Sequence, residues 1–203
     1  MKKNNIVKDT MILTLITLVA GLLLGLVYEI TKEPIAEQEL LAKQEAYQAV
    51  FEDADSFEPV IEGEDADLQN YLAESGFTAQ SVNEVMEAVD ASGAALGYVL
   101  NVTTSEGYGG DISFSMGIRE DGTLNGISIL SIGETAGLGM NADTDEFKGQ
   151  FANKKVEEFT VTKTGSTSDS EIDALSGATI TSRAMVGGVN AGLCAAQYVE
   201  GGK

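Results

Sequence analysis

The chain has 203 residues and a hydrophobic content of 43%, so it is long enough for one domain with a hydrophobic core and an additional segment. It contains one cysteine, Cys194, and no histidine, which excludes an intrachain disulfide, a cluster held by several thiolates, and every nucleophile that histidine activates. The formal net charge of −20 argues against a nucleic-acid-binding protein, because such proteins need a basic surface.

An apolar stretch near the N-terminus predicts a transmembrane helix over residues 10–30. A helix over residues 10–28 would be about 29 Å long, close to the ~30 Å thickness of the hydrocarbon core of a bilayer. A cleaved signal peptide is the alternative, but its apolar region is normally shorter and ends at a small-residue cleavage site. Lys2, Lys3 and Lys8 precede the stretch and place residues 1–9 in the cytoplasm. We therefore expect a single-pass protein of the cell membrane whose main domain is extracytoplasmic.

The next segment, residues 31–55, is predicted to be a stalk or the first helix of the outer domain. Pro34 stands where the anchor would end, and the apolar residues between Ile35 and Phe51 have the spacing of an amphipathic helix. Residues 53–75 are acidic and lack clear periodicity, which predicts a loop with one short helix. We place the outer domain at residues 56–203.

Alternation of apolar and polar residues in the outer domain predicts consecutive hairpins. The expected strands cover residues 82–89, 95–103, 112–118 and 124–131, and short turns join them at residues 90–93 and 120–122. Further elements are a short helix over residues 143–153, a strand over residues 159–163 and a final helix over residues 181–199. Consecutive hairpins imply an antiparallel sheet, and helices around it imply an α+β fold.

A hydroxyl-rich turn, residues 173–182, leads into the final helix. The simplest interpretation is a helix cap, because Ser and Thr are favoured there, and the turn holds four of them: Ser176, Thr179, Thr181 and Ser182. The start of a helix also attracts anions, and Gly177 and Ala178 leave room for a close approach to the backbone. These residues alone leave a plain cap, a bound phosphate and a covalently attached phosphate open.

Asp173 together with Ser176-Gly177-Ala178-Thr179 resembles the flavinylation motif of the FMN-binding domain family. The other motifs of that family are present in the same order: a glycine-rich run at 107–110, a hairpin with Gly126-Ile127, the loop 134–139, and Gln150-Phe151. With one membrane anchor in front, the arrangement is similar to the G subunits of the Rnf ion-translocating ferredoxin:NAD oxidoreductases. The C subunits of the sodium-translocating NADH:quinone reductases share the motif and the anchor, but the short chain favours the G subunits.

This resemblance implies that FMN is attached through its phosphate to Thr179 by a separate, magnesium-dependent flavin transferase. It further implies an electron relay that works with other membrane subunits of an oxidoreductase complex, with no catalytic side chain and no metal of its own. The implied cofactor-binding residues beside Thr179 are Tyr108, Glu134, Thr135, Leu138, Gly139, Ser176, Gly177 and Ala178. The alternative from another class is a membrane-anchored binding or structural domain without a cofactor, in which the hydroxyl-rich turn is only a helix cap.

Overall fold

The computed structural model describes the backbone of residues 3–201 and the side chains of residues 6–201. Met1 and Lys2, at the N-terminal end of the segment predicted to be cytoplasmic, lie outside the described residues. The chain divides into two compact units, residues 1–42 and 43–203. The second unit begins at Lys43, within residues 31–55, which we predicted to be a stalk or the first helix of the outer domain.

Helix α1 (Lys3–Val50) extends over both units. Its residues up to Ala42 form the first unit, and its last eight residues belong to the second. The helix is continuous through Pro34, so the predicted anchor and the predicted first helix are one element. Proline removes one backbone donor, but the residues that follow it are mostly strong helix formers. By length and composition α1 is able to cross a membrane.

A five-stranded antiparallel sheet forms the centre of the second unit. The strands neighbour one another in chain order: β1 (Ser56–Glu62), β2 (Gln80–Val89), β3 (Ala95–Thr104), β4 (Ile112–Arg119) and β5 (Leu124–Ile132). The predicted hairpins and the α+β class are confirmed. Strand β1 lies within the segment that we predicted as a loop, and the short helix expected there is α2 (Ala66–Glu74). As an edge strand, β1 half-buries only Phe57 and Ile61, and so it lacks the pattern of the other strands.

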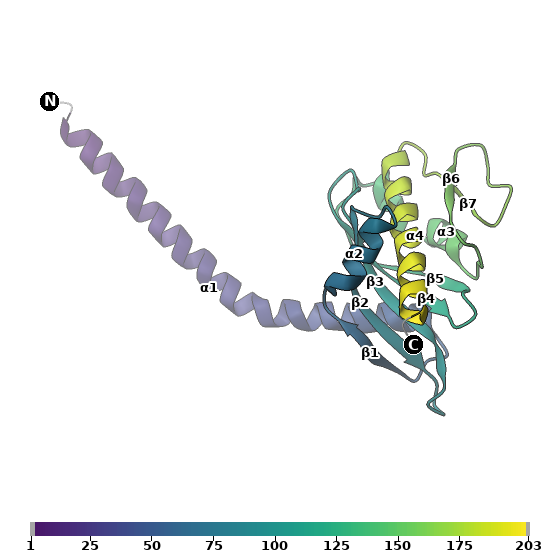
Figure 1. Ribbon diagram of the computed structural model, residues 1–203. Coiled ribbons are helices and arrows are strands. Elements are labelled where there is room, and N and C mark those ends of the chain that lie inside the picture. The colour runs from purple at the N-terminus through teal and green to yellow at the C-terminus, as the bar shows by residue number, and fades with distance from the viewer. Residues whose placement is uncertain (1–2, 202–203) are drawn as a thin grey trace. The chain divides into compact units, whose positions relative to one another are not determined.

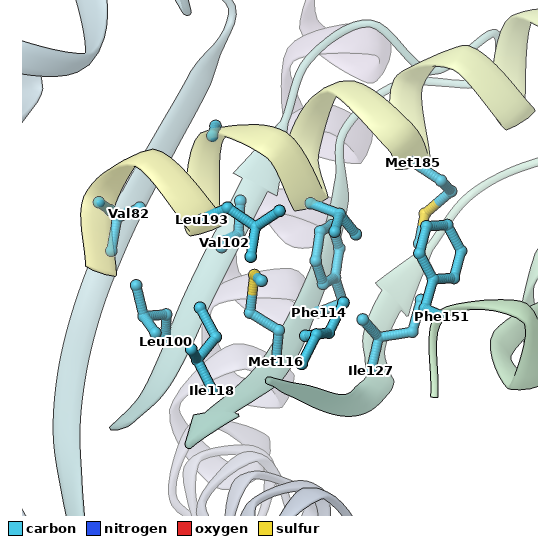
Figure 2. Close-up of a cluster of buried hydrophobic side chains, with 14 of the residues drawn as sticks. Val82, Leu100, Val102, Phe114, Met116, Ile118, Ile127, Phe151, Met185 and Leu193 are labelled. Atoms are coloured by element: carbon cyan, nitrogen blue, oxygen red, sulfur yellow. The ribbon is translucent and has the colours of Figure 1, made fainter. Parts of the chain in front are cut away.

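Helices α2 and α4 (Thr179–Gly201) cover one face of this sheet (Figure 1). Two glycines let α4 approach the strands closely, because an added Cβ would lie 2.0 Å from Met116 Sδ at Gly192 and 2.9 Å from the Phe114 ring at Gly188. Figure 2 shows Phe114 and Met116 pointing from the sheet toward α4. Both side chains are fully buried, so this layer is the main hydrophobic core.

The last residues of α1 pack against the opposite face of the sheet, within the second unit. Tyr47 is buried there, and its hydroxyl donates to Glu84 Oε2 at 2.5 Å and accepts from Asn101 Nδ2 at 2.6 Å. Lys43 forms an ion pair with the same Glu84 oxygen at 2.5 Å. Burial and the neighbouring carboxylate raise the pKa of Tyr47. Burial alone would raise the pKa of Glu84, but the hydrogen bonds from Lys43 and Tyr47 outweigh it and lower that pKa.

The remaining elements connect β5 to α4. The predicted helix over residues 143–153 is divided into two short pieces, because Thr144 caps a single turn and the chain then tightens into a 3₁₀ turn. The pieces are α3 (Asp145–Lys148) and η2 (Gly149–Phe151), and the 3₁₀ turn η1 (Gly139–Asp143) precedes them. The expected strand at residues 159–163 is β6 (Thr160–Thr162), which pairs in parallel with β7 (Glu171–Asp173). Strand β7 was not predicted, because only Ile172 is buried in it.

Candidate functional site

Three loops of the second unit surround a cavity of about 590 Å³. They are the loop 107–110 between β3 and β4, the loop 133–139 after β5, and the turn 175–178 before α4. The wall consists of Tyr108, Glu134, Thr135, Leu138, Gly139, Gly177, Ala178, Thr179, Ile180 and Thr181. Of the residues predicted from the sequence, only Ser176 is absent from this wall, and it is exposed to solvent.

Glycines allow the three loops to approach one another. An added Cβ at Gly109 would lie 2.3 Å from the carbonyl oxygen of Gly133, so the first two loops are in backbone contact. An added Cβ at Gly139 would lie 2.7 Å from Thr181 Oγ1, so the second loop contacts the start of α4. Gly177 has a φ of +75°, which favours glycine, and faces the Leu138 side chain. Larger residues at these positions would push the walls of the cavity apart.

A hydrogen bond to the Glu134 side chain connects the first two loops. Its side chain is only 8% exposed, and Oε1 accepts a 2.7 Å hydrogen bond from the backbone N–H of Tyr108. The second oxygen, Oε2, lies beside Gly139, because an added Cβ there would be 2.7 Å from it. A buried carboxylate of this kind is a strong hydrogen-bond acceptor on the cavity wall.

The turn before α4 is held by Ser182. Its Oγ accepts from the backbone N–H of Leu175 at 2.9 Å and donates to the carbonyl oxygen of Ala178 at 3.0 Å. The N–H of Ser182 also bonds that oxygen, so Ala178 occupies the N-cap position, and its methyl group cannot accept a hydrogen bond. The hydroxyls of Thr179 and Thr181 therefore do not cap the helix, and neither makes a side-chain hydrogen bond to another described residue. No fully buried side-chain oxygen among the described residues lacks a partner, so both hydroxyls are accessible from the cavity that these residues line.

Two wall residues, Ile180 and Thr181, were missing from the predicted site. Ile180 is exposed at the cavity, whereas Thr181 is only 1% exposed. The sequence placed Thr181 among several hydroxyls near the start of the helix, but it did not show which residue begins the helix. The predicted helix begins at residue 181, two residues after the observed start at Thr179. Because the direction of the side chain changes by about 100° per residue along a helix, this error made it impossible to predict which hydroxyl faces the cavity.

Comparison with known proteins assigns the domain that contains this cavity and the N-terminal helix to one family. Residues 107–193 match the model of the FMN-binding domain, and residues 1–50 match the RnfG N-terminal region. The chain is 32% identical over 201 residues to the G subunit of the proton-translocating ferredoxin:NAD(+) oxidoreductase complex of Clostridium ljungdahlii, covering 99% of this chain and 97% of that one. It is 33% identical over 184 residues to the G subunit of the Na(+)-translocating complex of Acetobacterium woodii, covering 89% of this chain and 86% of that one.

Among solved structures, the chain is similar to the crystal structure of Shewanella oneidensis NqrC, with a TM-score of 0.49 and 18% identity over 58% of this chain and 61% of that one. The matched domain and the glycine-lined cavity define the class as an FMN-binding domain behind an N-terminal apolar helix. The chain belongs to the family of G subunits of the Rnf ion-translocating ferredoxin:NAD(+) oxidoreductase complexes. The family predicted from the sequence motifs is confirmed.

Proposed function

We propose that this chain is the electron-carrying subunit of an Rnf-type ferredoxin:NAD oxidoreductase complex and that its FMN is attached to Thr179 through a phosphoester bond. The observation that carries this proposal is the position of Thr179. Thr179 lines the cavity of about 590 Å³, and its hydroxyl makes no side-chain hydrogen bond to another described residue. A hydroxyl with no other structural task is available for covalent modification.

The residues around the cavity suit FMN. The volume is within the usual range of about 300–1,000 Å³ for cofactor sites, and the glycines at 139 and 177 let the segments that form the wall approach one another closely. Apolar side chains of Tyr108, Leu138 and Ile180 are exposed around it and would contact the flat ring. The mixture of apolar walls and a few polar groups is typical of a site for an organic cofactor.

The start of α4 suits the phosphate. Because the first intrahelical acceptor is the Ala178 carbonyl, the N–H groups of Thr179, Ile180 and Thr181 have no intrahelical partner. Unpaired N–H groups and the positive end of the helix dipole favour a negatively charged group at this position. The N–H groups of Thr179 and Ile180 would hold the phosphate once it is joined to Thr179 Oγ1.

The bound FMN would supply reversible uptake and release of electrons, and the protein would supply its position and its electrostatic environment. The chain contains no histidine, and Cys194 is not among the residues that line the cavity. The side chains of the wall are therefore suited to hold a cofactor and not to transform a substrate. This is the behaviour expected of a relay between other subunits.

Attachment requires a separate flavin transferase, and Asp173 is our candidate for its recognition. The backbone N–H of Asp173 donates to Gln150 Oε1 at 2.6 Å, and its Oδ2 accepts from Ser166 Oγ at 3.1 Å. These bonds fix the end of β7 just before the Thr179 turn, while the side chain stays partly exposed. A transferase could therefore reach the carboxylate and the hydroxyl from the solvent side.

The apolar part of α1 supports a membrane anchor. Every described side chain between Ile6 and Ile30 is exposed, and an apolar surface of this extent needs a lipid or protein cover. The lysines before the stretch favour a cytoplasmic N-terminus, and with that orientation the cavity would lie outside the cytoplasm. A covalent bond would keep FMN in place there.

Coexpression of the full-length protein with a flavin transferase tests this proposal. We expect yellow in-gel fluorescence after denaturation in the wild type, complete loss in Thr179→Val, and no change in the control Thr160→Val, whose exposed side chain lies on β6. Equal fluorescence in wild type and Thr179→Val would refute attachment at Thr179. Absence of fluorescence from all three proteins would favour the anchored domain without a cofactor instead.

A further inference from the structure

Thr181 carries a hydroxyl whose task the proposed attachment does not explain. The residue is 1% exposed and lines the cavity, and its hydroxyl makes no side-chain hydrogen bond to another described residue. Since no fully buried side-chain oxygen among the described residues lacks a partner, this hydroxyl is open to the cavity. A hydroxyl that faces a cavity in this state is suited to a ligand that pairs with it.

Glu134 presents a second polar atom next to this hydroxyl. An ideal Cβ on Gly139 would lie 2.7 Å from Thr181 Oγ1 and 2.7 Å from Glu134 Oε2, so the two oxygens flank the same glycine. Glu134 is itself almost buried, and its other oxygen is engaged by the Tyr108 N–H. The wall at Gly139 therefore offers one hydroxyl donor and one carboxylate acceptor, both close to this glycine.

The negative charge of Glu134 limits which part of the cofactor can bind at the wall near Gly139. A phosphate beside Glu134 would suffer like-charge repulsion at a site with little water to screen it. The imide edge of the isoalloxazine ring has instead a carbonyl, an N–H and a second carbonyl in a row. The N–H matches the carboxylate, and a carbonyl matches the hydroxyl donor.

We propose that Thr181 and Glu134 bind the imide edge of the flavin ring, with the Thr181 hydroxyl donating to a ring carbonyl and Glu134 Oε2 accepting from the ring N–H. This inference rests on the proposed function and adds Thr181 as a positioning residue. It also orients the ring. The polar edge faces the buried wall at Gly139, and the apolar edge faces the exposed side chains of Tyr108, Leu138 and Ile180.

The proposed hydrogen bond has an electrochemical consequence. Reduction places negative charge on the imide part of the ring, and a hydroxyl donor stabilises that charge more than it stabilises the oxidised ring. Removal of the donor therefore disfavours the reduced form. A loss of about 1.4 kcal/mol, typical for a hydrogen bond to a charged group, corresponds to a tenfold change in the equilibrium, or about 30 mV for a two-electron couple.

The test is an anaerobic redox titration of full-length protein coexpressed with a flavin transferase, followed by the visible absorption of the flavin. Thr181→Val removes the hydroxyl at nearly constant shape, Thr181→Ser keeps it, and Thr160→Val is the control. We expect the Thr181→Val equilibrium to shift about tenfold toward the oxidised form, which lowers the potential, while Thr181→Ser and the control stay close to the wild type. Infrared difference spectra should show the matching shift of one flavin carbonyl band in Thr181→Val alone.

Each other outcome is also decisive. An unchanged potential and carbonyl band in Thr181→Val would overturn the role of Thr181 and leave the proposed function intact. If Thr181→Val remains without flavin while Thr181→Ser is loaded, the hydroxyl is required and the proposal is supported. Loss of loading in both would contradict it, because serine retains the hydroxyl. A wild type without covalent flavin would overturn the proposed function, and this inference with it.

Discussion

Gly139 is the position where a single methyl group perturbs the site most directly. In Gly139→Ala the new Cβ would lie 2.7 Å from Glu134 Oε2, 2.7 Å from Thr181 Oγ1 and 2.8 Å from Glu134 Cβ. These atoms belong to two different elements, so no single side-chain rotation relieves all three contacts. Overpacking of this kind costs typically 1–3 kcal/mol, and we expect a loss of about 2 kcal/mol.

For a domain of this size, 1 kcal/mol corresponds to a change of about 2–4 °C in the unfolding temperature, so Gly139→Ala should melt about 4–8 °C below the wild type. The assay is thermal unfolding of the detergent-solubilised full-length protein by circular dichroism. Gly149→Ala is the matched control, because Gly149 has φ −61° and an added Cβ meets nothing within 4 Å. That change should be neutral or slightly stabilising. If Gly139→Ala melted together with the wild type, the close packing of Glu134, Gly139 and Thr181 would be refuted.

Three further predictions concern the scaffold. Tyr47→Phe removes the hydroxyl that bonds Glu84 and Asn101 and should cost about 1–2 kcal/mol in thermal unfolding without reducing flavin content; a loss of flavin would contradict the separation of the two faces. Because the pKa of Glu84 is lowered in the folded state, its contribution to stability is present above the unfolded pKa of about 4.3 and is lost as the pH falls through the folded pKa. The difference in unfolding free energy between wild type and Glu84→Gln should therefore shrink below about pH 4, and a gap that is independent of pH would contradict this. Gly192→Ala should lower the unfolding temperature, because its Cβ would lie 2.0 Å from the sulfur of buried Met116 and overpacking costs about 1–3 kcal/mol; an unchanged melt would show that α4 does not approach β4 as described.

The hairpins of the sheet were predictable because they depend on local patterns. In β4 alternate residues from Ile112 to Ile118 are buried beneath α4, and the turn that follows has Gly122 at φ +82°, as a tight turn requires. Edge strand β1 and the parallel pair of β6 and β7 were not predictable in this way. Their pairing is decided by distant segments, and their own residues bury too little surface to produce a period.

Only part of the candidate site was predicted, because some of its features depend on local motifs and others depend on contacts between distant segments. The motifs identified the three loops, and the structure gathers them around one cavity. Thr181 was missed because its importance depends on the residue at which α4 begins and on the approach of Gly139. The interpretation of the hydroxyl-rich turn as a cap did not anticipate that Ala178 would occupy the cap position. A short motif identifies the residue types, but tertiary contacts decide which hydroxyl is free.

The attachment of FMN to Thr179 is the central claim, and peptide mass spectrometry of natively purified protein tests it most directly. We predict that the peptide containing residues 171–183 carries the mass of one FMN less one water, with fragment ions that place the addition on Thr179. Two results would contradict the account. One is an unmodified peptide from protein that carries its covalent flavin on another segment, and the other is a fragment series that places the addition on Ser176 or Thr181.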